Sequence, residues 1–310
     1  ASDLSYLLTM SKTTLILISA ISYLFVFYNS DIKNNFINVF FVNACICLFF
    51  GTFPENKKFL TPFQYGGDEV SELLGSNEYR NAFLSGSGYF GISSLYGLAF
   101  AFCLKLVVDS KRKIDYFKLL IIGIAGLFAG RVALVCYGIA ILYFVIVKKN
   151  LKILFFSIFS FFIFIFIINT VPSFEGVKLW FDEMFFNKSI GNSESFSQFK
   201  ETFLIPNNTI TLMFGDARYG SATSYYGGSD SGYIRNIFFG GLFYLFILMS
   251  TFLFLVYKVR NFLYIYLFVF ISLFLHFKGV FIFNNPGFFG VFLIVCIYFY
   301  KINQKRVLKK

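Results

Sequence analysis

Charged and metal-binding side chains are scarce in this sequence. Asp, Glu, Lys and Arg together make up 14% of the 310 residues, and there is a single histidine, which excludes a His-rich zinc site. The cysteines all fall inside apolar runs, at Cys45, Cys47, Cys103, Cys136 and Cys296. A thiol in such a run behaves as a small hydrophobic group. Neither a disulfide framework nor a metal site is therefore indicated.

Motifs for nucleotides are missing as well. The sequence contains no G-x-x-x-x-G-K-[ST] loop, and neither of its long polar segments contains a D-x-D pair. Phosphate loops and grouped carboxylates are common ways to hold nucleotides and divalent cations. We therefore expect no nucleotide, no metal and no other cofactor.

Apolar residues are abundant instead. The chain is 57% hydrophobic and contains 49 phenylalanines, and its mean hydropathy is +0.71. A helix that crosses the bilayer core needs roughly 20 apolar residues. The sequence predicts an all-α polytopic helix bundle, a single integral membrane domain over residues 1–310. The expected spans, nine in all, are 13–28, 36–53, 86–108, 117–130, 132–147, 151–170, 234–257, 262–278 and 281–300.

Lysine and arginine gather in alternate short connections between these spans, at 111–118, 148–152 and 258–260, and again at 301–310. The positive-inside rule places these segments in the cytoplasm. The C-terminus is then inside and the N-terminus outside. The net charge of +11 reflects cytoplasmic anchoring, and we expect no nucleic-acid partner. Because the chain starts at Ala1 without a methionine or a cleavable leader, we also expect a further span upstream.

Two long segments, 54–85 and 171–233, fall on the outer side in this orientation. The second is long enough for short amphipathic helices. Its aromatic residues Trp180, Phe181, Phe185 and Phe186 predict a face that lies in the membrane interface. The alternative is a loop that only rests on the membrane.

Four of the seven arginines, Arg80, Arg131, Arg218 and Arg235, fall on the outer side, where the positive-inside rule would deplete them. Lys278 lies at another outer turn. For Arg131 alone, a side chain that snorkels to the interface is an equal explanation. Five cations on one side favour an anionic ligand, because a guanidinium can give two parallel charge-assisted bonds to a phosphate. A lipid-linked pyrophosphate fits, since its tail would lie among the phenylalanine-rich helices.

Four short motifs follow one another in an order that resembles a known family. They are "EYRNAFLSGSGYFGISSLYG" (78–97), "FAGRVALV" (128–135), "GDARYG" followed by "SDSGYIRNIFFGGL" (215–242) and "HFKG" (276–279). Together they resemble the loops and turns of the bacterial O-antigen polymerases (Wzy), within the O-antigen polymerase and ligase superfamily. The chain is shorter than most of these polymerases, and its first residues match no part of them.

The resemblance implies an inverting, metal-independent glycosyltransferase with a GT-C-like bundle in the bacterial cytoplasmic (inner) membrane. Its donor and acceptor would both be oligosaccharides linked to undecaprenyl pyrophosphate, met at the outer face. Membrane lipids and a chain-length regulator protein would be its other partners. The lipid pyrophosphate would be the leaving group, so cations around it would stabilise the charge that develops there.

The resemblance also assigns roles to individual residues. Arg131 and Arg235 would stabilise the departing pyrophosphate, and Asp230 would act as the general base, with Asp216 as second choice. The residues expected to bind the pyrophosphate or the glycan are Arg80, Arg131, Arg218, Arg235, Lys278, Tyr233 and Asp216. The alternative for both aspartates is structural, as helix caps or as ion-pair partners of Arg218 and Arg235.

Two other functions stay open. An O-antigen ligase of the same superfamily would use a histidine in the large loop, but the single histidine, His276, lies at a helix end, where we expect a packed or interfacial residue. A flippase or transporter would also contain many spans and charges within the membrane. Such a protein more often contains helices broken near the middle of the bilayer.

Overall fold

Helices make up all of the regular structure in the residues that the computed structural model describes, and no strand occurs among them. Those residues are 32–53, 88–110, 112–182, 204–218, 226–285 and 287–307, with scattered positions between 11 and 22. The chain divides into two compact units. One is the Asn29–Lys188 unit, and the other, the C-terminal unit, combines Ala1–Tyr28 with Ser189–Lys310.

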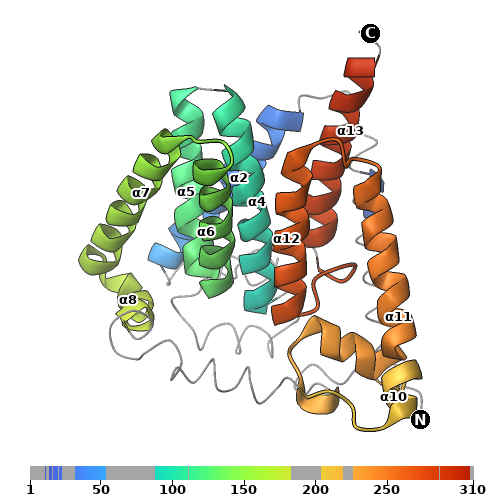
Figure 1. Ribbon diagram of the computed structural model, residues 1–310. Coiled ribbons are helices and arrows are strands. Elements are labelled where there is room, and N and C mark those ends of the chain that lie inside the picture. The colour runs from blue at the N-terminus through green and yellow to red at the C-terminus, as the bar shows by residue number, and fades with distance from the viewer. Residues whose placement is uncertain are drawn as a thin grey trace. The chain divides into compact units, whose positions relative to one another are not determined.

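The Asn29–Lys188 unit is built around helix α4, which packs against α5 and α6 (Figure 1). Its elements are α2 (Ile32–Thr52), α4 (Gly88–Ser110), α5 (Lys113–Ala129), α6 (Arg131–Ile146), α7 (Leu151–Thr170), the 3-10 turn η3 (Pro172–Phe174) and α8 (Glu175–Asp182). The middle of α4, from Leu98 to Leu104, is buried and consists only of apolar residues. These residues form the core of the unit.

Helix α8 lies within the predicted outer segment 171–233, which therefore contains a short helix as expected. Its Phe181 is 4% exposed and packs edge-on against Phe164 of α7, with 5.8 Å between ring centres. The predicted interfacial position of Phe181 was wrong, because the turn at η3 folds α8 back onto the core. The side chains of Trp180, Phe185 and Phe186 lie outside the described residues.

The C-terminal unit contains α10 (Thr209–Phe214), the 3-10 turn η6 (Tyr226–Gly228), α11 (Gly232–Tyr257), α12 (Leu263–Lys278), and a π-helical turn η7 (Phe288–Phe292) that continues as α13 (Leu293–Val307). Helix α11 packs along both α10 and α12. The buried face of α12 includes Ile265, Phe268 and Ile271, which recur at helical spacing. This spacing gives the unit an apolar core of its own.

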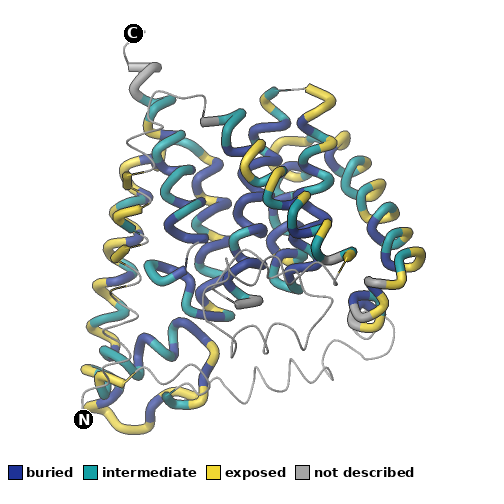
Figure 2. Tube along the Cα trace, turned by 180° about the vertical axis from the view of Figure 1, so that it is seen from behind, coloured by how far each residue is buried: buried dark blue, intermediate teal, exposed yellow. Residues whose placement is uncertain are grey.

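Four of the described helices, α2, α4, α7 and α11, are long and apolar enough to cross a membrane. Three shorter apolar helices cover Arg131–Ile146, Leu263–Lys278 and Phe288–Asn303. The most apolar, α7, has a mean hydropathy of 2.7, yet only 17% of it is buried. Exposed positions recur along α7 and α11 in Figure 2. Because such surfaces are stable beside hydrocarbon and not beside water, the prediction of an all-helical membrane protein is confirmed.

Most predicted span boundaries agree with the helices to within a few residues, and α7 covers 151–170 as expected. The last predicted span, 281–300, was wrong at its start, because the helix begins at the π-helical turn near Phe288. Phe283 has a φ of 57°, and the side chain of Asn285 accepts a hydrogen bond from the N–H of Gly287 at 2.8 Å. Because of this turn, the last helix starts near Phe288, later than the predicted position 281. Most of the predicted span 13–28 and the segment 54–85 lie outside the described residues.

Candidate functional site

Helix α11 is broken near its start at Gly241. This residue has φ 69° and ψ −171°, which glycine adopts without steric cost. A break leaves carbonyl groups of the preceding turn without helical partners. The Phe238 carbonyl accepts from the N–H of Asp216 at 2.8 Å. The Phe239 carbonyl accepts from the N–H of Ala217 at 2.9 Å. The loop after α10 is therefore docked onto the break in α11.

Asp216, the second choice for a general base, holds this loop in shape. Its carboxylate accepts hydrogen bonds from Thr211 Oγ1 at 2.7 Å and from the Tyr226 hydroxyl at 2.9 Å. The hydrogen bond to Asp216 raises the pKa of Tyr226. Arg218 lies over the Tyr226 ring, with 5.6 Å from the guanidinium carbon to the ring centre. Both oxygens of Asp216 are therefore engaged, one by α10 and one by η6. This geometry favours a structural role for Asp216, through two hydroxyl groups and not through the helix cap or the ion pair that was expected.

Asp230, the first choice for a general base, stands directly before α11. Its side chain is exposed and makes no hydrogen bond or ion pair with the rest of the described chain. Ser231 occupies the N-cap position of α11, and its carbonyl accepts from the N–H of Arg235 at 2.9 Å. Arg235 is half-buried in the first turns of the helix. A helix N-terminus carries a partial positive charge, so the charge of Arg235 adds to a potential that already favours anions.

His276 is completely buried in the last turn of α12, as the expectation of a packed residue allowed. Its Nδ1 accepts hydrogen bonds from the N–H groups of Phe281 and Ile282, both at 3.2 Å. Its Nε2 lies 3.0 Å from the side-chain amide of Asn236. The atom of Asn236 nearest to Nε2 is Nδ2. Because Nδ1 accepts two bonds, Nε2 of the neutral ring must carry the proton, so the amide of Asn236 has to be flipped to present its oxygen as the acceptor. His276 thus joins α11, α12 and the turn after α12.

Tyr233 packs against this buried histidine. The Tyr233 ring meets the His276 ring edge-on at 4.7 Å between centres, and its hydroxyl donates to the Leu273 carbonyl at 3.3 Å. At the neighbouring position, a Cβ on Gly232 would come within 2.6 Å of the carbonyl oxygens of His276 and Gly279. Only glycine lets the two backbones approach so closely. We call this contact between the start of α11 and the end of α12 the α11–α12 junction.

The α11–α12 junction brings several of the predicted site residues onto two adjoining helix ends. Tyr233 and Arg235 belong to the start of α11, Asp230 directly precedes it, and Lys278 belongs to the last turn of α12. The role of Asn236 and its contact with His276 were not predicted. The only signals for this contact in the sequence were that His276 and Asn236 each interrupt an apolar helix. A buried polar group needs a hydrogen-bond partner, so each of them predicts a polar neighbour.

Three of the predicted arginines are not part of this junction. Arg218 lies in the loop after α10. Arg131 is the first residue of α6, directly after the Gly130 turn, and is half-buried in the Asn29–Lys188 unit. Arg80 lies outside the described residues. Their proposed contacts with pyrophosphate stay predictions.

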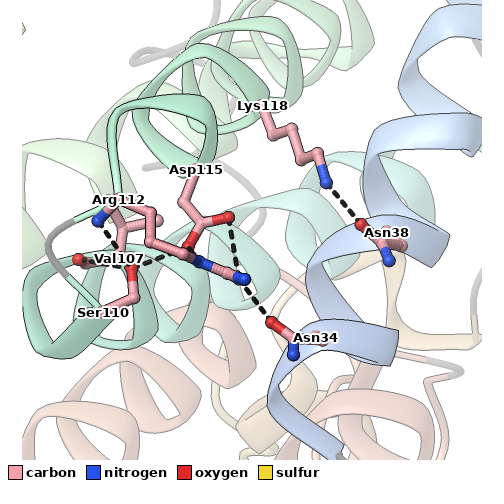
Figure 3. Close-up of polar contacts among 7 residues, drawn as sticks. All are labelled: Asn34, Asn38, Val107, Ser110, Arg112, Asp115 and Lys118. Carbon is pink, nitrogen blue, oxygen red and sulfur yellow. Dashed lines mark hydrogen bonds and ion pairs between the residues drawn. The ribbon is translucent and has the colours of Figure 1, made fainter.

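A second polar cluster closes the turn between α4 and α5 (Figure 3). The carboxylate of Asp115, 1% exposed, accepts from Ser110 Oγ at 2.6 Å and from Arg112 Nε at 2.9 Å. Burial opposes ionisation of Asp115, but these hydrogen bonds and the charge of Arg112 outweigh burial and lower its pKa. Asp115 is therefore an ionised anchor for this turn.

The same turn is tied to α2. Arg112 also donates to the side-chain oxygen of Asn34, and Lys118 Nζ donates to that of Asn38 at 2.6 Å (Figure 3). In the sequence, these cations predict only the orientation in the membrane. Asn34 and Asn38 are four residues apart, so they share one face of α2, which was the available signal for this contact.

No group of three or more His, Cys, Asp or Glu side chains that could hold a metal ion occurs in the described part of the chain. No family model, curated protein or solved structure matches the chain. The chemistry of the α11–α12 junction must therefore be argued from its own residues.

Proposed function

We propose that this protein is a polymerase of lipid-linked oligosaccharide repeat units. It transfers the growing glycan from undecaprenyl pyrophosphate to a sugar hydroxyl of a new unit that is linked to its own undecaprenyl pyrophosphate. The observation that carries the proposal is the α11–α12 junction, where a cationic, aromatic helix start meets a helix end that carries Lys278. An exposed carboxylate, Asp230, stands directly beside it.

The residues at the junction supply what such a transfer needs. The bond between the sugar C1 and the pyrophosphate oxygen breaks while the acceptor oxygen attacks C1 from the opposite face. Asp230, which makes no hydrogen bond or ion pair with other described residues, takes the proton of the acceptor hydroxyl. Arg235 and the positive end of α11 stabilise the charge that the departing lipid pyrophosphate gains. No cofactor takes part in these steps.

The junction suits this role because it is held rigid from several directions. His276, Asn236 and Tyr233 connect the two helix ends, and the loop that contains Asp216 and Arg218 is docked onto the break in α11. A preorganised cation costs no reorganisation as charge develops. Tyr233 is half-buried and supplies an aromatic edge to the glycan or the pyrophosphate.

The proposal includes a location and a topology. The bundle would have about nine spans and a GT-C-like arrangement, with the active face outside the bacterial cytoplasmic membrane. The exposed phenylalanines of α7 and α11 support a membrane location, and the cations of the α4–α5 turn support a cytoplasmic position for that turn. Arg80, Arg131 and Arg218 would contact the pyrophosphate or the glycan, and a chain-length regulator would be a protein partner.

A flippase for the same lipid-linked glycan is the second candidate. The break in α11 at Gly241 favours it, because transporters often place binding sites at discontinuous helices. An O-antigen ligase has less support, because His276 is buried and both of its ring nitrogens are engaged. A base must reach its substrate.

Deletion of the gene and gel analysis of the surface polysaccharide distinguish these functions. A product with a single repeat unit indicates a polymerase, an unligated intermediate indicates a ligase, and the absence of exported glycan indicates a flippase. Complementation with Arg235→Ala should fail to restore long chains. The matched control is Arg260→Ala, since Arg260 is exposed and its guanidinium carbon lies 3.7 Å from the centre of the Tyr257 ring, in the turn after α11. This variant should restore them.

A further inference from the structure

The Asn29–Lys188 unit contains a cavity of about 360 Å³ between helices α4, α5, α6 and α7. This volume lies in the range of ligand pockets. Its walls are formed mainly by leucine, isoleucine and phenylalanine side chains and by the backbones of Gly123 and Gly138. The cavity belongs to one unit and contains none of the residues assigned to the α11–α12 junction.

The cavity lies at mid-depth in the bundle. Phe100 is near the middle of α4, Gly138 near the middle of α6, and Ser157 and Ser160 near the middle of α7. Helices α4 and α7 are long and apolar enough to cross the membrane. The midpoint of such a helix lies in the hydrocarbon core of the bilayer.

Two of the polar side chains that line the cavity are already satisfied by their own helix. Ser157 Oγ donates to the Ile153 carbonyl at 2.8 Å, and Ser160 Oγ donates to the Phe156 carbonyl at 2.7 Å. The Tyr137 ring lines the cavity, and its hydroxyl, which makes no hydrogen bond with other described residues, is buried against Gly126 of α5, where a Cβ would overlap it. A buried water needs two to four polar partners. The lining therefore suits hydrocarbon and not water or a polar solute.

The cavity is closed on one side and open on the other. Its lining residues Phe100 and Gly123, on α4 and α5, are buried. In contrast, Leu127 of α5 and Gly138 of α6 are half-buried, and Phe161 of α7 is 41% exposed. The opening therefore lies beside α7, on the surface where this helix presents its exposed phenylalanines. At this depth the surrounding solvent is lipid chains.

We propose that this cavity binds one hydrocarbon chain of a membrane lipid, entering sideways past α7. The proposal stands whichever function the α11–α12 junction serves. Two lipids present at this depth could provide the chain: a phospholipid acyl chain or the tail of a polyprenyl phosphate. Both are apolar and flexible, and neither requires a hydrogen-bond partner from the wall.

Gly138 allows the cavity to be filled without disturbing its walls. A Cβ at Gly138 meets no atom within 4 Å, whereas a Cβ at Gly126 would overlap Tyr137. Gly138→Phe therefore places a ring in the open space, and replacing a helix-interior glycine also favours the helix. Gly138→Leu fills less of the space and serves as a second variant. Leu142→Phe is the matched control, because Leu142 is 57% exposed on the same helix, about one turn further on.

Photolabelling in vesicles tests the proposal. One set of vesicles contains phosphatidylcholine with a diazirine in one acyl chain, and the other contains unlabelled lipid with a diazirine-bearing polyprenyl phosphate. After irradiation, mass spectrometry should find adducts on the lining residues of α6 and α7 in at least one set, and the set identifies the source. These adducts should be lost in Gly138→Phe, reduced in Gly138→Leu and unchanged in Leu142→Phe. Adducts at exposed Phe155 should persist in all variants and report ordinary lipid contact.

Adducts on exposed Phe155 with none on the lining residues, or lining adducts unaffected by Gly138→Phe, would overturn the proposal. Thermal unfolding in detergent gives an independent readout. Lipid that binds the folded state raises the unfolding temperature by mass action, so added lipid should stabilise the wild-type protein and Leu142→Phe more than Gly138→Phe. An equal lipid response in all three proteins would contradict the proposal.

Discussion

The side-chain amide of Asn236 meets Nε2 of His276 at 3.0 Å in a site where both residues are buried. The two residues lie 40 positions apart in the chain and fix the start of α11 to the end of α12. Since the other ring nitrogen of His276 accepts two backbone N–H groups, one side chain orders three segments. Tyr233 and Arg235 belong to the turn that this contact holds.

Removing either partner of this contact should destabilise the protein. Asn236→Leu leaves the His276 Nε2–H without an acceptor, which costs about 1–3 kcal/mol for one buried polar group. His276→Leu leaves the Asn236 amide and two backbone N–H groups unsatisfied, so it should be the more damaging of the two. Thermal unfolding in detergent measures both variants. Phe270→Leu, at a residue of α12 that is 58% exposed, is the control, and equal stability of His276→Leu and this control would contradict the role of His276.

The membrane class and most helix boundaries could be predicted from the sequence because they depend on local composition. The run 151–170 is apolar throughout, and α7 covers it. The turn before Phe288 could not be predicted, because it depends on a contact between a side chain and the backbone that leaves no periodic pattern. In this contact His276 Nδ1 accepts from the N–H groups of Phe281 and Ile282. The break at Gly241 likewise depends on the loop that docks there.

The candidate site could be predicted only in part. Charged residues in an apolar chain are conspicuous, so Arg235, Asp230 and Lys278 were identified from the sequence. The engagement of Asp216 by Thr211 depends on the fold of a loop that has no periodic pattern. A hydrogen bond between residues of different helices leaves no spacing signal in one sequence, which is why Asn236 was missed.

Asp115 should stabilise the α4–α5 turn in a pH-dependent way. Its folded pKa lies below the ordinary value of 3.8, so its contribution is present above about pH 4 and is lost as the pH falls through the folded pKa. Asp115→Asn should cost on the order of 1–3 kcal/mol at pH 7, as expected for hydrogen bonds to a charged group, and the difference from wild type should shrink in acid.

Asp109→Asn is the matched control for this prediction. Asp109 is 46% exposed and pairs with Lys105 four residues earlier on the same helix, a contact worth about 0.3–0.5 kcal/mol. Unfolding temperatures in detergent at pH 7 and near pH 3.5 provide the comparison. A loss in Asp115→Asn that is the same at both pH values would show that its charge is not involved.

The type of cation at Arg131 should matter if it binds a phosphate. Arg131→Lys should reduce polymer formation nearly as much as Arg131→Ala, because an ammonium group cannot give two parallel bonds. Gel analysis of the polysaccharide measures the effect, with immunoblots to confirm equal protein abundance in the membrane. Full activity of Arg131→Lys would indicate a simple point charge or an interfacial anchor.

The orientation predicts which loops are accessible from outside the cell. Cysteine placed at Lys148, an exposed residue after α6, should be protected from an impermeant maleimide in intact cells, and cysteine placed at Ser221 should be labelled. Ser110, at the end of α4 on the same predicted side, is a less suitable position for the cysteine, because its hydroxyl donates a hydrogen bond to Asp115. The background carries Cys45→Ser, because Cys45 is exposed and the other cysteines are buried. Labelling at 148 but not at 221 would invert the topology.

Substitutions at Arg235 and Asp230 should change the rate of the purified protein in different ways. Arg235→Ala removes stabilisation of the departing pyrophosphate and should lower the rate by about 10²–10³. Asp230→Asn removes the base and should lower it by about 10²–10⁴, with partial recovery at higher pH, where the acceptor hydroxyl depends less on a base. The rate of glycan extension with a lipid-linked repeat unit measures both. Unimpaired extension by Asp230→Asn would remove its catalytic role.

Extension of a lipid-linked repeat unit by the purified wild-type protein in vesicles, with EDTA present, is the most direct measurement of the proposed function. The glycan is separated by size, and released undecaprenyl pyrophosphate is quantified in the same samples. The proposal predicts chains of several units, with one undecaprenyl pyrophosphate released for each unit joined and no effect of EDTA. A product that never exceeds one unit, or activity that is lost completely with EDTA, would contradict it.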